Sequence, residues 1–189
     1  MTRNTYALSL VFFTFFLGGI SQGEQIPEVA PSPEAVNAMR LLESQDLYQQ
    51  ELGFLRLEAL REPSTVKTIT RYLDHRSADV RAYSLRAIAA IDGVAAVPLL
   101  LTHLRDRHPT VRRAALLGLE PLQSSNPEIL PAFIKALKDH DTEVRIAAVD
   151  VVSRIDDSRA RAAIRLRQTQ ERRRDVRRVL KLAAQRLQP

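Results

Sequence analysis

A Val-Arg pair recurs along this chain at a nearly constant interval. The pairs begin at Val80, Val111, Val144 and Val176, so successive steps are 31, 33 and 32 residues. A period of this size is typical of chains that stack one small supersecondary unit several times. It constrains the fold strongly, because each unit can bury its apolar side chains only against its neighbours.

Each of the first three units has the pattern of a helix, a polar turn and a second helix. A leucine lies seven residues before each valine, at Leu73, Leu104 and Leu137, and the intervening turns read "DHRSAD", "RDRHPT" and "KDHDTE". Positions four, eight and eleven after the valine are small or aliphatic, which places them on one stripe of a helix. The segments before the turns, such as "VPLLLTHL", have the same aliphatic spacing. The sequence therefore predicts helix pairs that bury apolar stripes against one another.

The stretch "VPLLLTHLRDRHPTVRRAALLGL" resembles a HEAT-type repeat, particularly the short variety of phycobilisome-lyase-like HEAT proteins, and the likeness covers about residues 64–156. Tetratricopeptide and ankyrin repeats have similar periods, but the chain has no tryptophan and no "TPLH" run. We expect an all-α, HEAT-like α-solenoid of about four to five stacked helix pairs. Its expected segments are a signal peptide (1–23), a Pro-rich spacer (24–33), an atypical N-terminal helical cap (34–62), three HEAT-like repeats (63–156) and a basic C-terminal capping repeat (157–189).

The first residues differ from the rest of the chain. Arg3 is followed by the apolar stretch "YALSLVFFTFFLGGI", and Ser21 and Gly23 are small residues of the kind a signal peptidase reads. We expect a cleaved export signal and a periplasmic or secreted protein. The alternative is an N-terminal membrane anchor, although this stretch falls short of the ~20 apolar residues that a spanning helix needs. The chain has no cysteine, which excludes disulfides and thiolate ligands.

The arginine of each pair has a structural role in the families that this chain resembles. There it pairs with an acid in a turn of the same or the adjacent repeat, which implies a structural ladder at Arg81, Arg112 and Arg145, with Arg177 in the same register. Three acids lie six residues before the arginines that follow them: Asp106, Asp139 and Glu171. The alternative is a row of arginines that binds anions.

Motifs for catalysis or cofactor binding are missing from the sequence. The glycines after residue 23 are isolated, so phosphate-binding loops and nucleophile elbows are excluded. His75, His108 and His140 lie in successive turns, and helices stacked ~8 to 10 Å apart cannot bring all three to one zinc ion with bonds of ~2 Å. The acids of "DHDTE" (139–143) alternate as in a calcium loop, but Val144 occupies the position of the required glycine, and we expect them to cap the following helix. We expect no cofactor, no metal and no enzyme activity.

A first candidate binding surface lies opposite the buried stripe. Positions two, six and nine after each valine make up this surface: Ala82, Arg86, Ala89, Arg113, Leu117, Glu120, Ile146, Asp150 and Ser153. In HEAT-like solenoids this helix layer lines the concave face. Leu117 and Ile146 are apolar where a solvated face would be polar, unless curvature or a terminal helix covers them. The expected partner-binding residues are Arg86, Arg113, Leu117, Ile146 and Asp150.

A second candidate surface is the basic C-terminal unit. Residues 153–189 contain 12 Lys or Arg against 4 Asp or Glu, whereas residues 24–152 contain 15 against 18. The expected anion-binding residues are Arg165, Arg167, Arg172, Arg173, Arg174, Arg177 and Arg178. Such a block attracts anionic lipid head groups, phosphate-bearing polymers or acidic proteins. Nucleic acid is not expected as the partner, because the region has no aromatic residue for base stacking. The alternative is a solvated cap that binds nothing.

These observations together predict an exported, monomeric HEAT-repeat scaffold that binds a protein partner and performs no chemistry. The first alternative is a binder of an anionic membrane surface or polymer through the arginine-rich end. The second is a lyase-like or metal-dependent enzyme. An export signal argues against the lyase role, because phycobilisome lyases act inside the cell.

Overall fold

The computed structural model describes residues 29–187, in which the regular structure is helical. The expected signal peptide (1–23) and the first half of the expected spacer (24–33) lie outside these residues. The α-helices are α1 (Pro33–Leu42), α2 (Leu47–Leu60), α3 (Val66–Thr70), α4 (Ala78–Asp92), α5 (Val97–His103), α6 (Pro109–Leu119), α7 (Ile129–Ala136), α8 (Thr142–Val152), α9 (Ser158–Gln170) and α10 (Arg174–Arg186).

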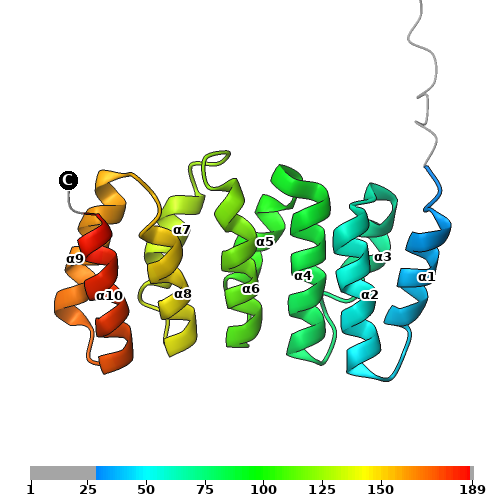
Figure 1. The fold of residues 1–189 in the computed structure, drawn as a ribbon, viewed down its shortest axis with the longest axis horizontal. Helices are drawn as coiled ribbons and strands as arrows, with labels where there is room; N and C mark the ends of the chain where they lie inside the picture. Colours follow the sequence, from blue (N-terminus) through cyan, green and yellow to red (C-terminus); the bar gives the residue numbers. More distant parts are fainter. Residues whose placement is uncertain (1–28, 188–189) are drawn as a thin grey trace, which may run out of the picture.

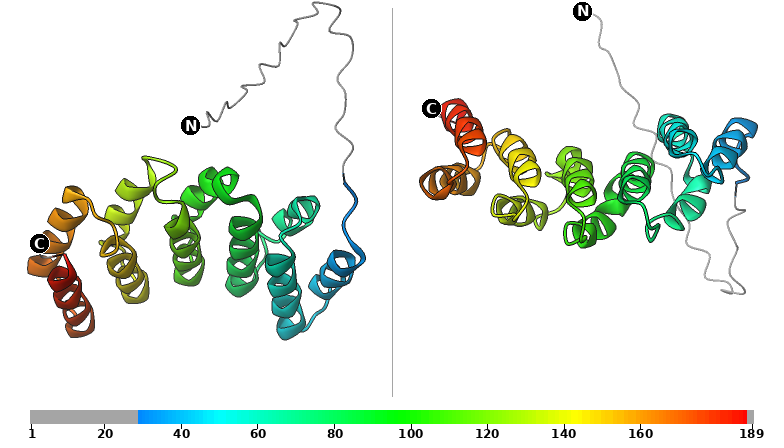
Figure 2. Two further views of the ribbon diagram at one scale, coloured as in Figure 1. Left: turned by 45° about the horizontal axis from the view of Figure 1, so that its top comes forward. Right: turned by 90° about the horizontal axis from the view of Figure 1, so that it is seen from below.

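Successive helices form antiparallel pairs that stack side by side in chain order (Figure 1). One layer contains the second helix of each pair, from α2 to α10, and the other contains α3, α5, α7 and α9 (Figure 2). The row bows so that the layer of second helices lies on the inner side of the curve (Figure 2, right). The prediction of an all-α solenoid with four to five stacked helix pairs is confirmed, and the described residues form five.

The core is continuous because each repeat contributes the same stripe to it. The four valines of the Val-Arg pairs are at most 1% exposed, and position four is fully buried at Ser84, Ala115 and Ala148. Position eight is buried at Ile88, Leu119 and Val152. Each apolar side chain of this size removed from water contributes roughly 1.5–3 kcal/mol. Since neither layer can bury its stripe alone, the stack is held together by contacts between repeats.

Two residues end helices where the chain must pass from one repeat to the next. Gly93 follows α4 with φ 53° and ψ −121°, a conformation that side chains with a Cβ rarely adopt. Pro121 lies two residues after the end of α6 at Leu119, in the 3-10 turn Glu120–Leu122. Both turns send the chain back to the outer layer.

One helical stretch among the described residues, Ala78–His103, is long and apolar enough to cross a bilayer by length and composition alone, with a mean hydropathy of 1.7. Gly93 divides this stretch into α4 and α5, which lie in different layers of the stack (Figure 1). Helix α4 contacts α2 and α6 on its two sides. Its apolar residues are therefore accounted for by the solenoid core.

Candidate functional site

The repeated arginine of the Val-Arg pair links each repeat to the next one. Arg112 donates from Nε to Asp139 Oδ2 at 2.9 Å and from Nη2 to Asp139 Oδ1 at 2.7 Å. Its remaining nitrogen, Nη1, donates to the carbonyl oxygens of Asp106 at 2.9 Å and Arg107 at 3.3 Å, in the turn of its own repeat. The Arg112 side chain is only 4% exposed. One guanidinium fork thus joins two successive turns, a geometry that lysine cannot reproduce.

Arg81 has the same arrangement, whereas Arg145 keeps the carbonyl contacts and binds its acid through Nε alone, with Nη2 at 3.4 Å from Thr142 Oγ1. Arg81 contacts Asp106 through Nε at 3.1 Å and Nη2 at 3.0 Å, and donates from Nη1 to the His75 carbonyl at 2.8 Å. Arg145 donates from Nε to Glu171 Oε2 at 3.0 Å and from Nη1 to the Asp139 carbonyl at 2.9 Å. In all three cases the acid belongs to the following repeat, whereas the carbonyls belong to the arginine's own turn.

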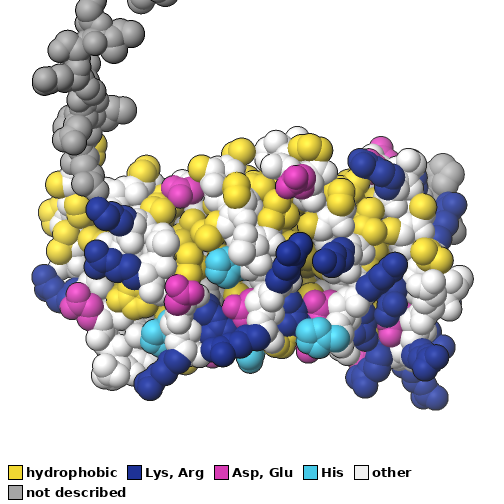
Figure 3. All heavy atoms as spheres, turned by 180° about the vertical axis from the view of Figure 1, so that it is seen from behind, with side chains coloured by type: hydrophobic (Ala, Val, Ile, Leu, Met, Phe, Trp, Pro, Cys, Tyr) yellow, Lys and Arg dark blue, Asp and Glu magenta, His cyan; other side chains and the backbone are white. Residues whose placement is uncertain are grey.

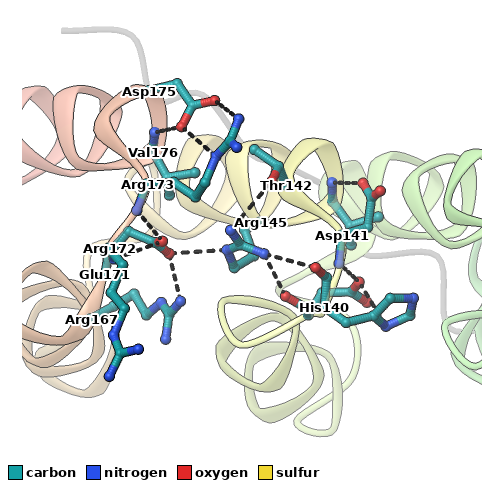
Figure 4. Close-up of polar contacts among 12 residues, drawn as sticks. His140, Asp141, Thr142, Arg145, Arg167, Glu171, Arg172, Arg173, Asp175 and Val176 are labelled. Atoms are coloured by element: carbon teal, nitrogen blue, oxygen red, sulfur yellow. Dashed lines mark hydrogen bonds and ion pairs between the residues drawn. The ribbon is translucent and has the colours of Figure 1, made fainter.

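Glu171 is the most enclosed acid of the ladder. Figure 4 shows its carboxylate between the guanidinium groups of Arg145 and Arg167, with Arg167 Nη2 at 2.5 Å from Oε2. Oε1 accepts from the backbone N–H groups of Arg172 and Arg173 at 3.0 and 2.9 Å. Burial by itself raises the pKa of Glu171, but the hydrogen bonds from the Arg173 amide, Arg167 and Arg145 outweigh it and lower this pKa to about 2.

The pKa values of the two ladder aspartates shift in the same direction. Burial raises the pKa of Asp139, but hydrogen bonds from the Arg112 side chain and the Asp141 amide outweigh burial, and the net pKa is lowered. Asp106 has the same balance with Arg81 and the His108 amide. The carboxylates are therefore held ionised, which suits a structural ion pair and not a proton donor.

The ladder ends at both termini of the stack. Arg177 has the correct register but is exposed and forms no ion pair among residues 29–187, because no further described repeat supplies an acid. At the other end the register falls on Gln50, a buried residue whose Nε2 donates to the Leu42 carbonyl at 3.2 Å. A neutral amide replaces the arginine here, and the turn of the following repeat has His75 where the later turns have the ladder acid.

The polar turns use their other side chains as caps. Asp141 accepts from the backbone N–H groups of Glu143 and Val144 at the start of α8, the role predicted for the acids of "DHDTE". His75 and His108 accept backbone N–H groups through Nδ1, and His140 Nε2 lies 3.1 Å from Arg112 Nη2. The described residues contain no group of three or more His, Cys, Asp or Glu side chains that could hold a metal ion.

The predicted concave residues are distributed unevenly between solvent and core. Leu117 is 43% exposed on α6, and Arg113 is exposed beside it. Arg86 is exposed and donates to Glu58 at 3.2 Å, while Asp150 accepts from Arg154 at 2.6 Å. Ile146 is only partly exposed and packs against the core, so it is a weaker contact residue than the sequence indicated.

Two positions assigned to this face by spacing are wrong. Ala82 is 4% exposed and Ser153 is 6% exposed. Ala82 belongs to the hydrophobic core, and Ser153 is the C-cap of α8, with its Oγ donating to the Asp150 carbonyl at 2.9 Å.

Position six after the valine forms one row across the whole inner layer. It is occupied in chain order by Leu55, Arg86, Leu117, Asp150 and Leu182. Leu55 is 41% exposed on α2 and Leu182 is 52% exposed on α10. Neither leucine is among the predicted partner-binding residues, although the same register, extended to the terminal helix pairs, includes both. The row alternates apolar and charged side chains.

The predicted anion-binding arginines separate into different environments. Arg172, Arg174, Arg177 and Arg178 are exposed around the turn between α9 and α10. Arg173 pairs with Asp175 at 3.1 Å, and Arg167 is bound to Glu171 in the ladder. Arg165 instead lines a cleft with Arg154, Arg161 and Arg186. Lysine and arginine side chains gather at this end of the outer face (Figure 3).

The outer face also has an apolar groove of about 720 Å³ between α5 and α7. Leu101, Leu104 and Pro131 line it together with basic residues such as Arg105 and Lys135. Apolar side chains are visible along this face in Figure 3.

Comparisons with known proteins agree with the repeat architecture. The family described as HEAT repeats matches residues 40–120 and 97–185. Protein YibA of Escherichia coli strains K12 and O157:H7 is 33% identical over 84 residues, which is 44% of this chain. The aligned part is 30% of the YibA length, so the chain spans about a third of these curated relatives.

Solved structures show the same fold at low sequence identity. The complex of CpcE and CpcF of phycocyanin lyase from Nostoc sp. PCC7120 matches with a TM-score of 0.66 and 21% identity, over 79% of this chain and 96% of that one. A designed armadillo repeat protein in complex with the peptide (KR)4 matches with a TM-score of 0.53 and 13% identity, over 80% of each chain.

Proposed function

This chain belongs to the HEAT repeat family, and from that premise we propose that it is an exported scaffold that binds a protein partner along its concave face and has no catalytic activity. The observation that carries the proposal is the position-six row. Three of its five side chains are leucines that expose 41–52% of their surface: Leu55, Leu117 and Leu182. The leucines repeat at every second helix pair of the inner layer, so a partner segment that lies along this layer contacts them at successive points.

The chemistry of the row indicates what kind of segment fits it. Arg86 and Asp150 stand between the leucines in ion pairs with Glu58 and Arg154, so a partner needs apolar side chains for the leucines and polar groups for the intervening positions. Arg113, exposed on α6 next to Leu117, adds a cation at the centre. A helical or extended peptide that crosses the inner layer meets these requirements.

The absence of catalysis is proposed from how the buried charges are used. Arg81, Arg112, Arg145 and Glu171 are the buried ionisable residues of the described chain, and each is bound to an ion-pair partner. The lowered pKa values of the ladder acids suit permanent charges. Two structural relatives are described in complexes, CpcE with CpcF and the armadillo design with a peptide, which supports partner binding as a use of this fold.

Export is proposed from the sequence of residues 1–23. The apolar stretch 6–20 follows Arg3, and small residues stand at 21 and 23. A partner in the cell envelope or outside the cell follows from this location.

The test is capture of partners by the mature protein, residues 24–189, from a cell-envelope and extracellular extract of its source at low and high salt. The diagnostic variant is L117D/L182D, because both leucines are exposed and their replacement spares the core. Ile146 is left intact since it packs against the core. The matched control V94D/L166D adds the same two charges at exposed aliphatic residues outside the position-six row, Val94 (56% exposed) and Leu166 (52%).

We expect one protein to be retained at high salt by the native protein and by V94D/L166D, and lost by L117D/L182D. Unchanged capture by L117D/L182D would contradict the site. Recovery only of lipid, polymer or a mixture that is lost as salt rises would favour the arginine-rich end instead, because several phosphate contacts weaken steeply with ionic strength.

A further inference from the structure

A cleft of about 610 Å³ lies at the carboxyl end of the stack, away from the ladder turns. It is lined by the residues that follow α8, by α9 and by the end of α10. Four arginines line it: Arg154, Arg161, Arg165 and Arg186. Asp156 is the one acid among its lining residues.

The four arginines differ in how their charge is balanced. Arg154 contacts Glu120 at 2.5 Å and Asp150 at 2.6 Å, and Arg161 is paired with Asp156. Arg165 and Arg186 form no ion pair with any residue from 29 to 187. Both are exposed, one from α9 and the other from α10, and they line the same cleft. The cleft therefore holds two guanidinium groups without a counter-ion among the described residues.

We propose that this cleft binds a phosphomonoester carried on an apolar organic group. A phosphomonoester has a charge close to −2 near neutral pH, which matches the two unbalanced arginines, whereas a carboxylate or a sulfonate supplies only −1. The guanidinium fork also suits the geometry of phosphate oxygens. The proposal is independent of the concave row, because the cleft contains none of its residues.

The size and lining of the cleft indicate the rest of the ligand. Binding sites for organic ligands are typically about 300–1,000 Å³, well above the volume of a bare phosphate ion. Ile155 and Leu187 supply apolar surface beside the arginines. This chemistry occurs in soluble phosphorylated metabolites and in lipid head groups such as phosphatidic acid, so the experiment has an arm for each source.

The soluble arm is isothermal titration of the full mature chain with phenyl phosphate, with benzenesulfonate as the monoanionic comparison. The diagnostic variant is R165Q/R186Q. The matched control is R172Q/R174Q, which removes the same charge from exposed arginines at the opposite end of α9. The lipid arm is co-sedimentation with phosphatidylcholine vesicles that contain phosphatidic acid, and circular dichroism verifies that each variant is folded.

We expect saturable one-to-one binding of phenyl phosphate that is stronger than that of benzenesulfonate. The affinity should fall about tenfold or more in R165Q/R186Q, because charge-assisted hydrogen bonds are lost, and less than about threefold in R172Q/R174Q. Vesicle binding with the same variant dependence and no response to phenyl phosphate would assign the site to a lipid head group. No saturable binding in either arm, or an equal loss in the two variants, would overturn the proposal.

Discussion

Replacing Arg112 with alanine tests whether the ladder holds the repeats together. The substitution removes the two contacts to Asp139 at 2.9 and 2.7 Å and the two to the turn carbonyls at 2.9 and 3.3 Å. It also leaves the Asp139 carboxylate, 12% exposed, without its cation. Removing one member of a buried ion pair costs about 3–5 kcal/mol. Because Asp139 keeps the hydrogen bond from the Asp141 amide at 2.8 Å, we expect a loss near the lower end, about 3 kcal/mol.

The adjacent residue provides a matched control. Arg113 is exposed on the same turn of α6, so Arg113→Ala removes the same side chain and charge with an expected cost below about 0.5 kcal/mol. Urea unfolding followed by circular dichroism at 222 nm measures both. With a slope of about 2 kcal/mol per M, Arg112→Ala should lower the midpoint by about 1.5 M. The double variant R112A/D139A should lose less than the sum of its single variants, by about 1–2 kcal/mol.

A shift for Arg112→Ala no larger than that for Arg113→Ala would refute this reasoning. So would additive effects of the Arg112 and Asp139 substitutions, because two groups that stabilise each other cannot be lost independently. Either result would mean that apolar packing alone sets the stability of the junction between α6 and α8.

Three further predictions concern Glu171, two glycines and the expected signal peptide. The pKa of Glu171 is about 2 in the folded chain against an ordinary 4.5, so its contribution to the free energy of unfolding is present above pH 4.5 and is lost as pH falls toward 2. In urea denaturation at pH 6, 4 and 3, Glu171→Gln should therefore lose less stability on acidification than the native protein. An equal loss in the two proteins would contradict this prediction. A Cβ at Gly53 would lie 2.7 Å from Leu42 Cδ2 and 2.9 Å from the Ala38 carbonyl oxygen, so Gly53→Ala should cost about 1–3 kcal/mol of stability, although alanine has the better helix propensity. Gly118→Ala should cost less, because the nearest atom to its Cβ would be 3.1 Å away. A larger loss for Gly118→Ala than for Gly53→Ala in thermal melts would contradict the packing described. Protein recovered from the cell envelope or medium should begin at Glu24 by intact mass, whereas a mass that retains residues 1–23 would indicate an anchor.

The repeat period was sufficient to predict the fold, because it fixes both the helix pairs and the direction in which they stack. The spacing of the ladder arginines did not determine their partners. Arg112 has an acid six residues before it and another 27 residues after it, and both distances suit a turn contact. The structure shows that Arg112 binds the carboxylate of Asp139 and the carbonyl of Asp106, since the side chain of Asp106 is already bound to Arg81.

The binding surfaces were harder to predict, because exposure depends on neighbours that lie a repeat away. Ala82 has the spacing of an outward residue, yet it is buried in the core, in a helix that packs against α2 and α6. The basic run near the C-terminus is continuous in sequence, but α9 is 13 residues long, roughly 20 Å, with Arg161 in its first turn and Arg173 beyond its far end. The arginines of this run therefore lie in three places: in the ladder, around the turn between α9 and α10, and in the cleft at the carboxyl end of the stack.

The three arginine–acid contacts of the ladder lie along one edge of the solenoid, where the turns within each helix pair are found (Figure 1). The opposite edge carries the connections between repeats, which have no ladder pair. At that edge Arg154 and Glu120 of successive repeats form an ion pair at 2.5 Å, but its side chains are 55% and 29% exposed. Because an exposed ion pair stabilises less than a buried one, we expect a change in curvature to alter the separation of the helices more at this edge than at the edge that holds the ladder.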